Sequence, residues 1–112
     1  MNNSPLVSIV VVTYNSSKYI TETLDSIAKQ TYNNIEVIIS DDFSTDNTTE
    51  LCENWLSLNK GNFVRGILLK SDRNTGISAN LNRGYNACLG EWVKSIAGDD
   101  LLLPNAIDDN IK

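Results

Sequence analysis

The feature that most constrains the fold is a continuous, mostly apolar run near the start of the chain. Residues 7–12 read VSIVVV, and most of them are branched at Cβ. Such residues favour extended structure, and a run without polar alternation is typical of a strand buried on both faces of a parallel sheet. After a polar stretch, apolar residues recur at Ile20, Leu24 and Ile27, the spacing of one helix face. The chain therefore begins with a strand followed by an amphipathic helix.

The same unit repeats along the chain. The segments that we expect to form strands are 7–12, 35–40, 63–69 and 92–98. A helix is predicted after each strand: the second contains Leu51 and Leu58, the third covers 77–89, and the last begins near Pro104. Strands that alternate with helices predict an α/β fold with a parallel, helix-covered sheet, and 112 residues without a visible linker suit one domain.

Composition limits the classes of function. With 41% apolar and 21% charged residues, the chain suits a folded domain and not a disordered one. A net charge of −5 without a basic run argues against binding to nucleic acid. The longest apolar run is far shorter than the roughly 20 residues of a membrane span, and the N-terminus shows no secretory signal. We expect Cys52 and Cys88 to be reduced core residues of a cytoplasmic protein, with any peripheral membrane contact through parts outside this chain.

Polar residues follow three of the expected strands at the point where each ends. Thr13, Tyr14 and Asn15 follow the first strand, the pair Asp41-Asp42 follows the second, and the pair Asp99-Asp100 follows the fourth. Ligands of open α/β sheets bind outside the carboxyl ends of the strands. If these three strands are neighbours, their ends form one crevice. An aromatic face with a carboxylate acceptor suits a nucleobase that carries an imide N–H, and a second carboxylate pair suits a ribose or a metal that bridges two phosphates.

Each of these features also has a purely structural interpretation. Asp41-Asp42 could stabilise the start of the second helix, for which Ser44, Thr45 and Asp46 are the candidate caps. Asp99-Asp100 could be a solvated turn, and Tyr14 could serve packing. We expect both Trp55 and Trp92 to lie in the core. It is the combination of three marked strand ends that favours a binding site.

Several competing kinds of site are absent from the sequence. There is no GxGxxG after the first strand and no GxxxxGK[ST], so dinucleotide and P-loop sites are not indicated. The chain contains no His, which argues against a zinc site and excludes a Ser–His–Asp triad within it.

The ordered set of motifs resembles the family 2 inverting glycosyltransferases of the GT-A fold. The matching segments are 7–15, 26–32, 35–46, 74–78, 82–84, 90–92 and 98–100. The resemblance implies a three-layer α/β/α domain in which Thr13, Tyr14 and Asn15 line the nucleotide pocket. It also implies that Asp42 accepts a hydrogen bond from the base, typically uracil. Asp99 and Asp100 would occupy the motif that holds Mg²⁺ or Mn²⁺ on the diphosphate and contacts the ribose.

The chain departs from the family pattern at two positions. Ala97 replaces a further aspartate of many relatives, so that metal binding would rest on Asp99 and Asp100 alone. Leu81 replaces an arginine of many relatives, so that a phosphate contact would be absent or supplied by another residue.

The resemblance also sets an expectation for how much of an enzyme is present. Family domains are longer and carry the acceptor site and the catalytic base after the metal motif. We therefore expect residues 1–112 to be the donor-binding half of a transferase, with a sheet incomplete at the C-terminus, no catalytic base within the chain and no activity alone. The expected partners are a UDP-sugar donor and a saccharide or lipid-linked acceptor. Two other interpretations remain open: a receiver-like module that binds Mg²⁺ and accepts phosphate, and a non-catalytic interaction domain that self-associates through an exposed sheet edge.

Overall fold

The computed structural model describes residues 4–111, so that Met1–Asn3 and Lys112 lie outside it. The prediction about a secretory signal concerns the N-terminus and is not addressed by the described residues. Its elements are β1 (Val7–Thr13), α1 (Ile20–Ala28), β2 (Ile35–Asp41), α2 (Thr48–Asn59), a 3₁₀ turn (Lys60–Asn62), β3 (Arg65–Lys70), α3 (Ile77–Asn86), β4 (Trp92–Ala97) and α4 (Ala106–Ile111). The predicted alternation of strands and helices is confirmed. None of the described helices is long and apolar enough to cross a membrane.

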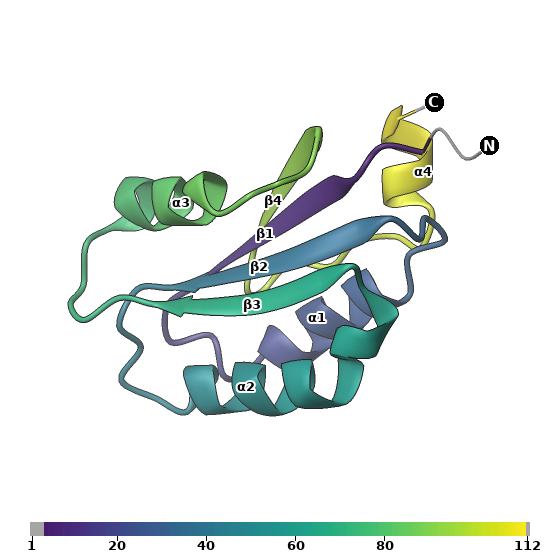
Figure 1. The fold of residues 1–112 in the computed structure, drawn as a ribbon. Coiled ribbons are helices and arrows are strands. Elements are labelled where there is room, and N and C mark those ends of the chain that lie inside the picture. Colours follow the sequence, from purple (N-terminus) through teal and green to yellow (C-terminus); the bar gives the residue numbers. More distant parts are fainter. Residues whose placement is uncertain (1–3, 112) are drawn as a thin grey trace.

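The four strands form one parallel sheet in the order β3-β2-β1-β4 (Figure 1). The first strand therefore lies between the second and the fourth, with Val7 opposite both Ile35 and Trp92. At the other end of β1, Thr13 is paired with Asp41, and Val12 is paired with Ala97. The polar residues that follow β1, β2 and β4 consequently meet at one edge of the sheet, as the sequence predicted.

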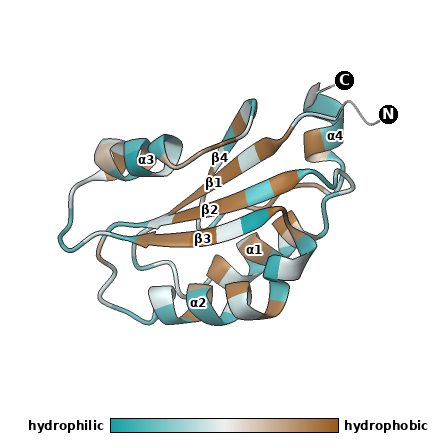
Figure 2. Ribbon diagram, in the orientation of Figure 1, coloured by the Kyte–Doolittle hydropathy of each residue, from teal (hydrophilic) through white to brown (hydrophobic). Residues whose placement is uncertain are grey.

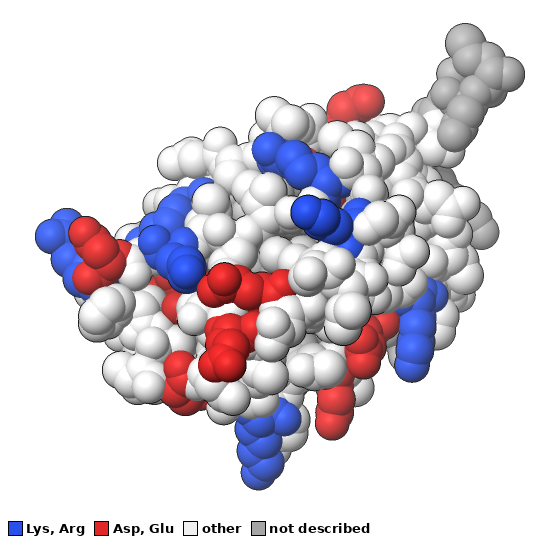
Figure 3. All heavy atoms as spheres, turned by 60° about the horizontal axis from the view of Figure 1, so that its bottom comes forward, with Lys and Arg blue, Asp and Glu red and all other residues white. Residues whose placement is uncertain are grey.

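Helices cover both faces of the sheet, which gives the expected three layers. The helices α1 and α2 lie on one face and α3 lies on the other (Figure 1). The helix α4 lies near the end of the sheet at which β1 begins, away from the carboxyl ends of the strands (Figure 1). Apolar residues are concentrated in the strands, and the helices are of mixed character (Figure 2). The core between the sheet and α1/α2 contains Ile9, Val11, Ile20, Leu24, Ile27, Val37, Ile39, Cys52 and Trp55. On the face of the molecule that Figure 3 shows, Lys and Arg side chains are scattered among Asp and Glu side chains.

The other face of the sheet is held partly by polar contacts. Glu36 of β2 is buried and accepts hydrogen bonds from Ser8 Oγ (2.5 Å) and Leu89 N (2.7 Å), and its carboxylate also pairs with Arg65 Nε (2.9 Å). Burial alone would raise the pKa of Glu36, but these hydrogen bonds and the charge of Arg65 outweigh it and hold the pKa below its ordinary value. Gly84 lies where α3 packs on the sheet. A Cβ atom added to Gly84 would lie 2.5 Å from Val10 Cγ1, so glycine allows α3 to approach the sheet closely.

Three local expectations were wrong. The third helix ends at Asn86 and not at residue 89, because the chain turns there and Leu89 N binds the buried carboxylate of Glu36. Trp92 is 54% exposed, because β4 is an edge strand of the described sheet, whereas Trp55 is 6% exposed and lies in the core as predicted.

The third wrong expectation concerns the start of α2. Its N-cap residue is Asn47, none of the three predicted residues. The carboxylate of Asp46 lies one residue further out and accepts hydrogen bonds from Thr48 N (3.0 Å) and Thr48 Oγ1 (2.5 Å). Cys52 and Cys88 are free thiols, as expected, although only Cys52 is fully buried.

Candidate functional site

A cavity of about 590 Å³ opens at the carboxyl ends of β1, β2 and β4. Its volume falls within the range of roughly 300 to 1,000 Å³ that is typical of small-molecule sites. Five of the six predicted binding residues line it: Thr13, Tyr14, Asn15, Asp42 and Asp99. The others that line it are Val12, Ser16, Lys18, Tyr19, Asn74, Gly76, Ile77, Asn80, Ala97 and Gly98. The predicted binding residues at the strand ends therefore lie, except for Asp100, around one cavity.

The three predicted residues at the end of β1 differ in what they offer to a ligand. Tyr14 is 49% exposed, and its ring is available at the cavity. Thr13 is buried, and its hydroxyl donates a hydrogen bond to Asp41 Oδ1 (2.6 Å). Asn15 has a positive φ of 50°, and its side-chain oxygen accepts from Thr45 N (2.8 Å). Of the three, Tyr14 is the one whose whole side chain is without a hydrogen bond within residues 4–111, whereas the Thr13 hydroxyl and the Asn15 side-chain oxygen are both engaged.

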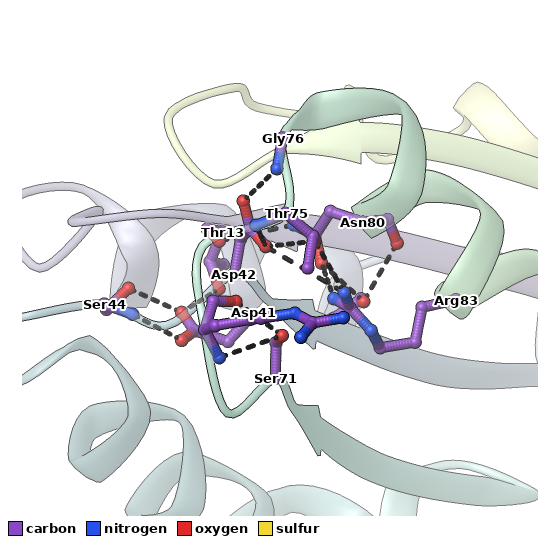
Figure 4. Close-up of polar contacts among 11 residues, drawn as sticks. Thr13, Asp41, Asp42, Ser44, Ser71, Thr75, Gly76, Asn80 and Arg83 are labelled. Carbon is purple, nitrogen blue, oxygen red and sulfur yellow. Dashed lines mark hydrogen bonds and ion pairs between the residues drawn. The ribbon is translucent and has the colours of Figure 1, made fainter.

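The first aspartate of the pair after β2 is structural. Asp41 accepts hydrogen bonds from Ser44 N (2.9 Å) and Ser44 Oγ (2.6 Å) in addition to the bond from Thr13 (Figure 4). These contacts hold the turn between β2 and α2. Asp41 is not among the residues that line the cavity.

The second aspartate faces the cavity and fixes its wall. Asp42 is 4% exposed, and its carboxylate accepts hydrogen bonds from Thr75 N (2.8 Å), Thr75 Oγ1 (2.6 Å) and Gly76 N (2.8 Å), as Figure 4 shows. Burial alone would raise the pKa of Asp42, but these bonds and the charge of Arg83 lower the pKa below its ordinary value. A carboxylate has about four lone-pair positions, so three donors leave about one for a ligand.

Two residues of α3 support this arrangement. Arg83 donates to Asn80 Oδ1 (2.8 Å) and to Thr75 Oγ1 (2.7 Å), and its Nη2 lies 3.9 Å from Asp42 Oδ1. Asn80 Oδ1 also accepts from Ser40 Oγ (2.7 Å), which ties the helix to β2. The sequence reasoning missed Thr75, Asn80 and Arg83 as parts of the site. For Asn80 and Arg83 the available signal was their spacing, because residues three apart on a helix share one face, whereas Thr75 lies in the loop before α3.

The acidic pair after β4 divides in a similar way. Asp100 closes the turn: its backbone N–H donates to Ala97 O (3.0 Å), and its Oδ2 accepts from Ala97 N (3.3 Å). Asp99 lines the cavity, is exposed, and forms no hydrogen bond or ion pair within residues 4–111. The solvated-turn interpretation therefore describes Asp100 in part, and Asp99 remains available to a ligand.

These two carboxylates fit a divalent cation that also binds a phosphorylated ligand. In the described part of the chain, no group of three or more His, Cys, Asp or Glu side chains could hold a metal by itself. Mg²⁺ does not need such a group, because it is commonly held by one or two carboxylates together with substrate phosphates and water. Asp99, which lines the cavity, and Asp100 Oδ1, which has no hydrogen-bond partner within residues 4–111, would supply that minimal set.

Comparisons with known proteins give one consistent result. Residues 8–111 match the family described as "Glycosyl transferase family 2". Glycosyltransferase GlyG of Streptococcus pneumoniae is 38% identical over 105 residues, which are 94% of this chain and 34% of that protein. The chain thus spans about a third of the length of this curated relative.

Solved structures resemble the whole described fold. S. aureus TarS in complex with UDP-GlcNAc superposes with a TM-score of 0.83 at 31% identity, and the match covers 94% of this chain and 30% of that one. The mannosyltransferase PcManGT from Pyrobaculum calidifontis, in complex with GDP-Man and Mn²⁺, gives 0.82 at 30% identity over 91% of this chain and 29% of its own. These likenesses confirm the expected GT-A type of α/β architecture.

Proposed function

Because this chain belongs to glycosyl transferase family 2, we propose that it binds the nucleotide-diphosphate sugar from which the enzyme transfers a sugar. In this proposal residues 1–112 are the donor-binding part, and the donor is linked to UDP. The sugar passes with inversion to a saccharide or lipid-linked acceptor. The observation that carries the proposal is the cavity at the strand ends that is lined by Tyr14, Asp42 and Asp99 together.

The base is assigned to the side of the cavity formed by Tyr14 and Asp42. An aromatic ring offers a stacking surface for a base. The carboxylate of Asp42 is an acceptor only, and its lowered pKa keeps it ionised at neutral pH. It therefore favours a base with an N–H at that position, such as uracil, and disfavours cytosine, which presents a lone pair there. Guanine also presents such an N–H, and the relative PcManGT is in complex with GDP-Man. The relative TarS is in complex with UDP-GlcNAc, which supports the choice of uracil.

The diphosphate is assigned to the side of the cavity formed by Asp99, which Asp100 follows in the same turn although it does not itself line the cavity. A chain of net charge −5 needs a cation to accept a diphosphate beside two carboxylates. We propose that these aspartates hold Mg²⁺ or Mn²⁺ there, and the relative PcManGT is in complex with Mn²⁺. When bound, such an ion stabilises negative charge on the leaving nucleoside diphosphate.

The base that deprotonates the acceptor is not assigned to this chain. An inverting displacement needs a group that takes the proton from the acceptor hydroxyl. At the cavity, the carboxylate of Asp42 is engaged by Thr75 and Gly76, and Asp99 is assigned to the metal. We therefore propose that the catalytic base and the acceptor site lie outside residues 1–112. A receiver-like module is not favoured, because β1 ends in Thr13 and not in an acidic pair.

Calorimetric titration with UDP tests the proposed donor site. We expect UDP to bind in the presence of Mn²⁺, to bind much more weakly after EDTA treatment, and to bind about tenfold more tightly than CDP, which has the same phosphates but lacks the N–H. GDP tested in parallel distinguishes a uracil site from a guanine site. A folded sample that binds neither UDP nor GDP with Mn²⁺ would contradict the proposal.

A further inference from the structure

We propose that Lys18 binds the diphosphate of the donor nucleotide and is the residue through which this chain distinguishes a nucleoside diphosphate from the bare nucleoside. The inference rests on the proposed function, because it names a contact of the same ligand. It is carried by the charges of the cavity, by the position of the loop between β1 and α1, and by the lack of a hydrogen-bond or ion-pair partner for the Lys18 ammonium among residues 4–111.

The charges that line the cavity point to this residue. Of the lining residues, three are charged: Lys18, Asp42 and Asp99. The negative charge of Asp42 is already compensated by donors from Thr75 and Gly76 and by the nearby guanidinium of Arg83. The charged groups of the cavity that remain available to a ligand are the carboxylate of Asp99 and the ammonium of Lys18. A diphosphate that shares a metal ion with Asp99 still carries negative charge, which the ammonium can neutralise.

The loop that carries Lys18 lies beside the turn that carries Asp99. Ser16, two residues before Lys18, packs directly against Gly98, because a Cβ atom added to Gly98 would lie 2.8 Å from Ser16 Oγ. Ser16 O accepts a hydrogen bond from Tyr19 N (3.1 Å), which fixes the start of α1 in the same place. Lys18 and Asp99 therefore approach the cavity from adjacent segments, as the two sides of a diphosphate site would.

The ammonium of Lys18 is not committed to another part of the protein. Its Nζ lies 5.3 Å from the centre of the Tyr19 ring, and it forms no hydrogen bond or ion pair within residues 4–111. By contrast, Arg65, Lys70 and Arg83 pair with Glu36, Glu53 and Asp42 respectively. The ring contact holds the side chain over the cavity wall at little cost, because a cation near an aromatic face is weakly attracted and stays exposed.

A matched pair of variants tests the inference. Lys18→Ala removes the proposed contact, and Lys29→Ala removes the same charge at the other end of α1, where Lys29 is exposed and does not line the cavity. Binding of UDP and of uridine is measured by calorimetry with Mn²⁺ at two salt concentrations. We expect Lys18→Ala to weaken UDP binding about tenfold and to reduce its salt dependence. Lys29→Ala should bind UDP as the original chain does, and Lys18→Arg should retain most of the affinity.

The outcomes separate this inference from the proposed function. If UDP binds the original chain and Lys18→Ala equally well, Lys18 is not a phosphate ligand and the donor site itself stands. If Lys18→Ala weakens UDP and uridine by the same factor with unchanged salt dependence, its role is structural and the inference is wrong. If the original chain binds no nucleotide, the proposed function fails, and this inference fails with it.

Discussion

Asp99→Asn is expected to abolish the effect of Mn²⁺ on UDP binding. In the original chain we expect Mn²⁺ to raise the affinity about 100-fold, because the ion joins the diphosphate to a carboxylate that would otherwise repel it. Asp99 lines the cavity and forms no hydrogen bond or ion pair in the described part of the chain, so removing its charge breaks no contact there. Asparagine keeps the size of the side chain but loses the charge that holds a hard cation. The measurement is a UDP titration with Mn²⁺ and with EDTA.

Glu91→Gln is the matched control for that experiment. Glu91 is exposed, and it lies just before β4, whereas Asp99 follows the opposite end of the same strand. The variant removes one negative charge without touching the cavity. It should therefore retain the full response to Mn²⁺. If Asp99→Asn retains the Mn²⁺ response as well, the metal lies elsewhere, and the assignment of this acidic pair is wrong.

Asp42→Asn is expected to lose both stability and the preference for UDP over CDP. The carboxylate of Asp42 accepts three hydrogen bonds from Thr75 and Gly76. The amide group of asparagine has only one oxygen acceptor, and its NH₂ group would face donors of Thr75 or Gly76 instead of accepting from them. Donors left unpaired in a buried position cost free energy, so we expect the free energy of unfolding to fall by about 2 kcal/mol. The same change removes the acceptor for the base, and the ratio of UDP to CDP affinity should fall toward one.

The pH dependence of stability gives a second measure of Asp42. Its pKa is lowered in the folded chain, so its stabilising contribution is present above the pKa of an unfolded aspartate and is lost as the pH falls through the folded pKa. Urea unfolding followed by circular dichroism from neutral to acidic pH should therefore show a weaker acid sensitivity in Asp42→Asn. Asp72→Asn, at an exposed position that does not line the cavity, is the control and should change neither stability nor selectivity. An Asp42→Asn variant as stable and as selective as the original chain would contradict the site as described.

The fold was largely predictable because each strand has a recognisable local sequence pattern. The run 7–12 is apolar and β-branched except at Ser8, and it forms an interior strand that is buried on both sides. The exception shows the limit of that reasoning. The prediction placed Trp92 in the core, but β4 lies at the edge of the described sheet. The exposure of Trp92 therefore depends on what pairs beside β4, which its own sequence does not specify.

The site was predictable where it depends on strand ends and not where it depends on helix packing. Tyr14 and Asp42 follow their strands directly and Asp99 follows its strand after Gly98, so parallel pairing alone brings them together. Arg83 reaches Asp42 only because α3 crosses the sheet at the close distance that Gly84 allows. That contact joins residues far apart in the chain and has no local signature. The division of each aspartate pair into a structural and an available member likewise depends on the turns that follow.

The proposed donor site is tested most directly by locating the nucleotide and the metal on the chain. Amide resonances of the isotopically labelled chain can be followed by NMR while UDP is added, first with Mg²⁺ and then with traces of Mn²⁺, which broadens signals near its site. The account predicts shifts at Tyr14, Asp42 and Gly76 with Mg²⁺, and broadening by Mn²⁺ centred on Asp99 and Asp100. Broadening centred on another acidic pair, such as Asp108-Asp109, or shifts confined to residues outside the cavity, would contradict it.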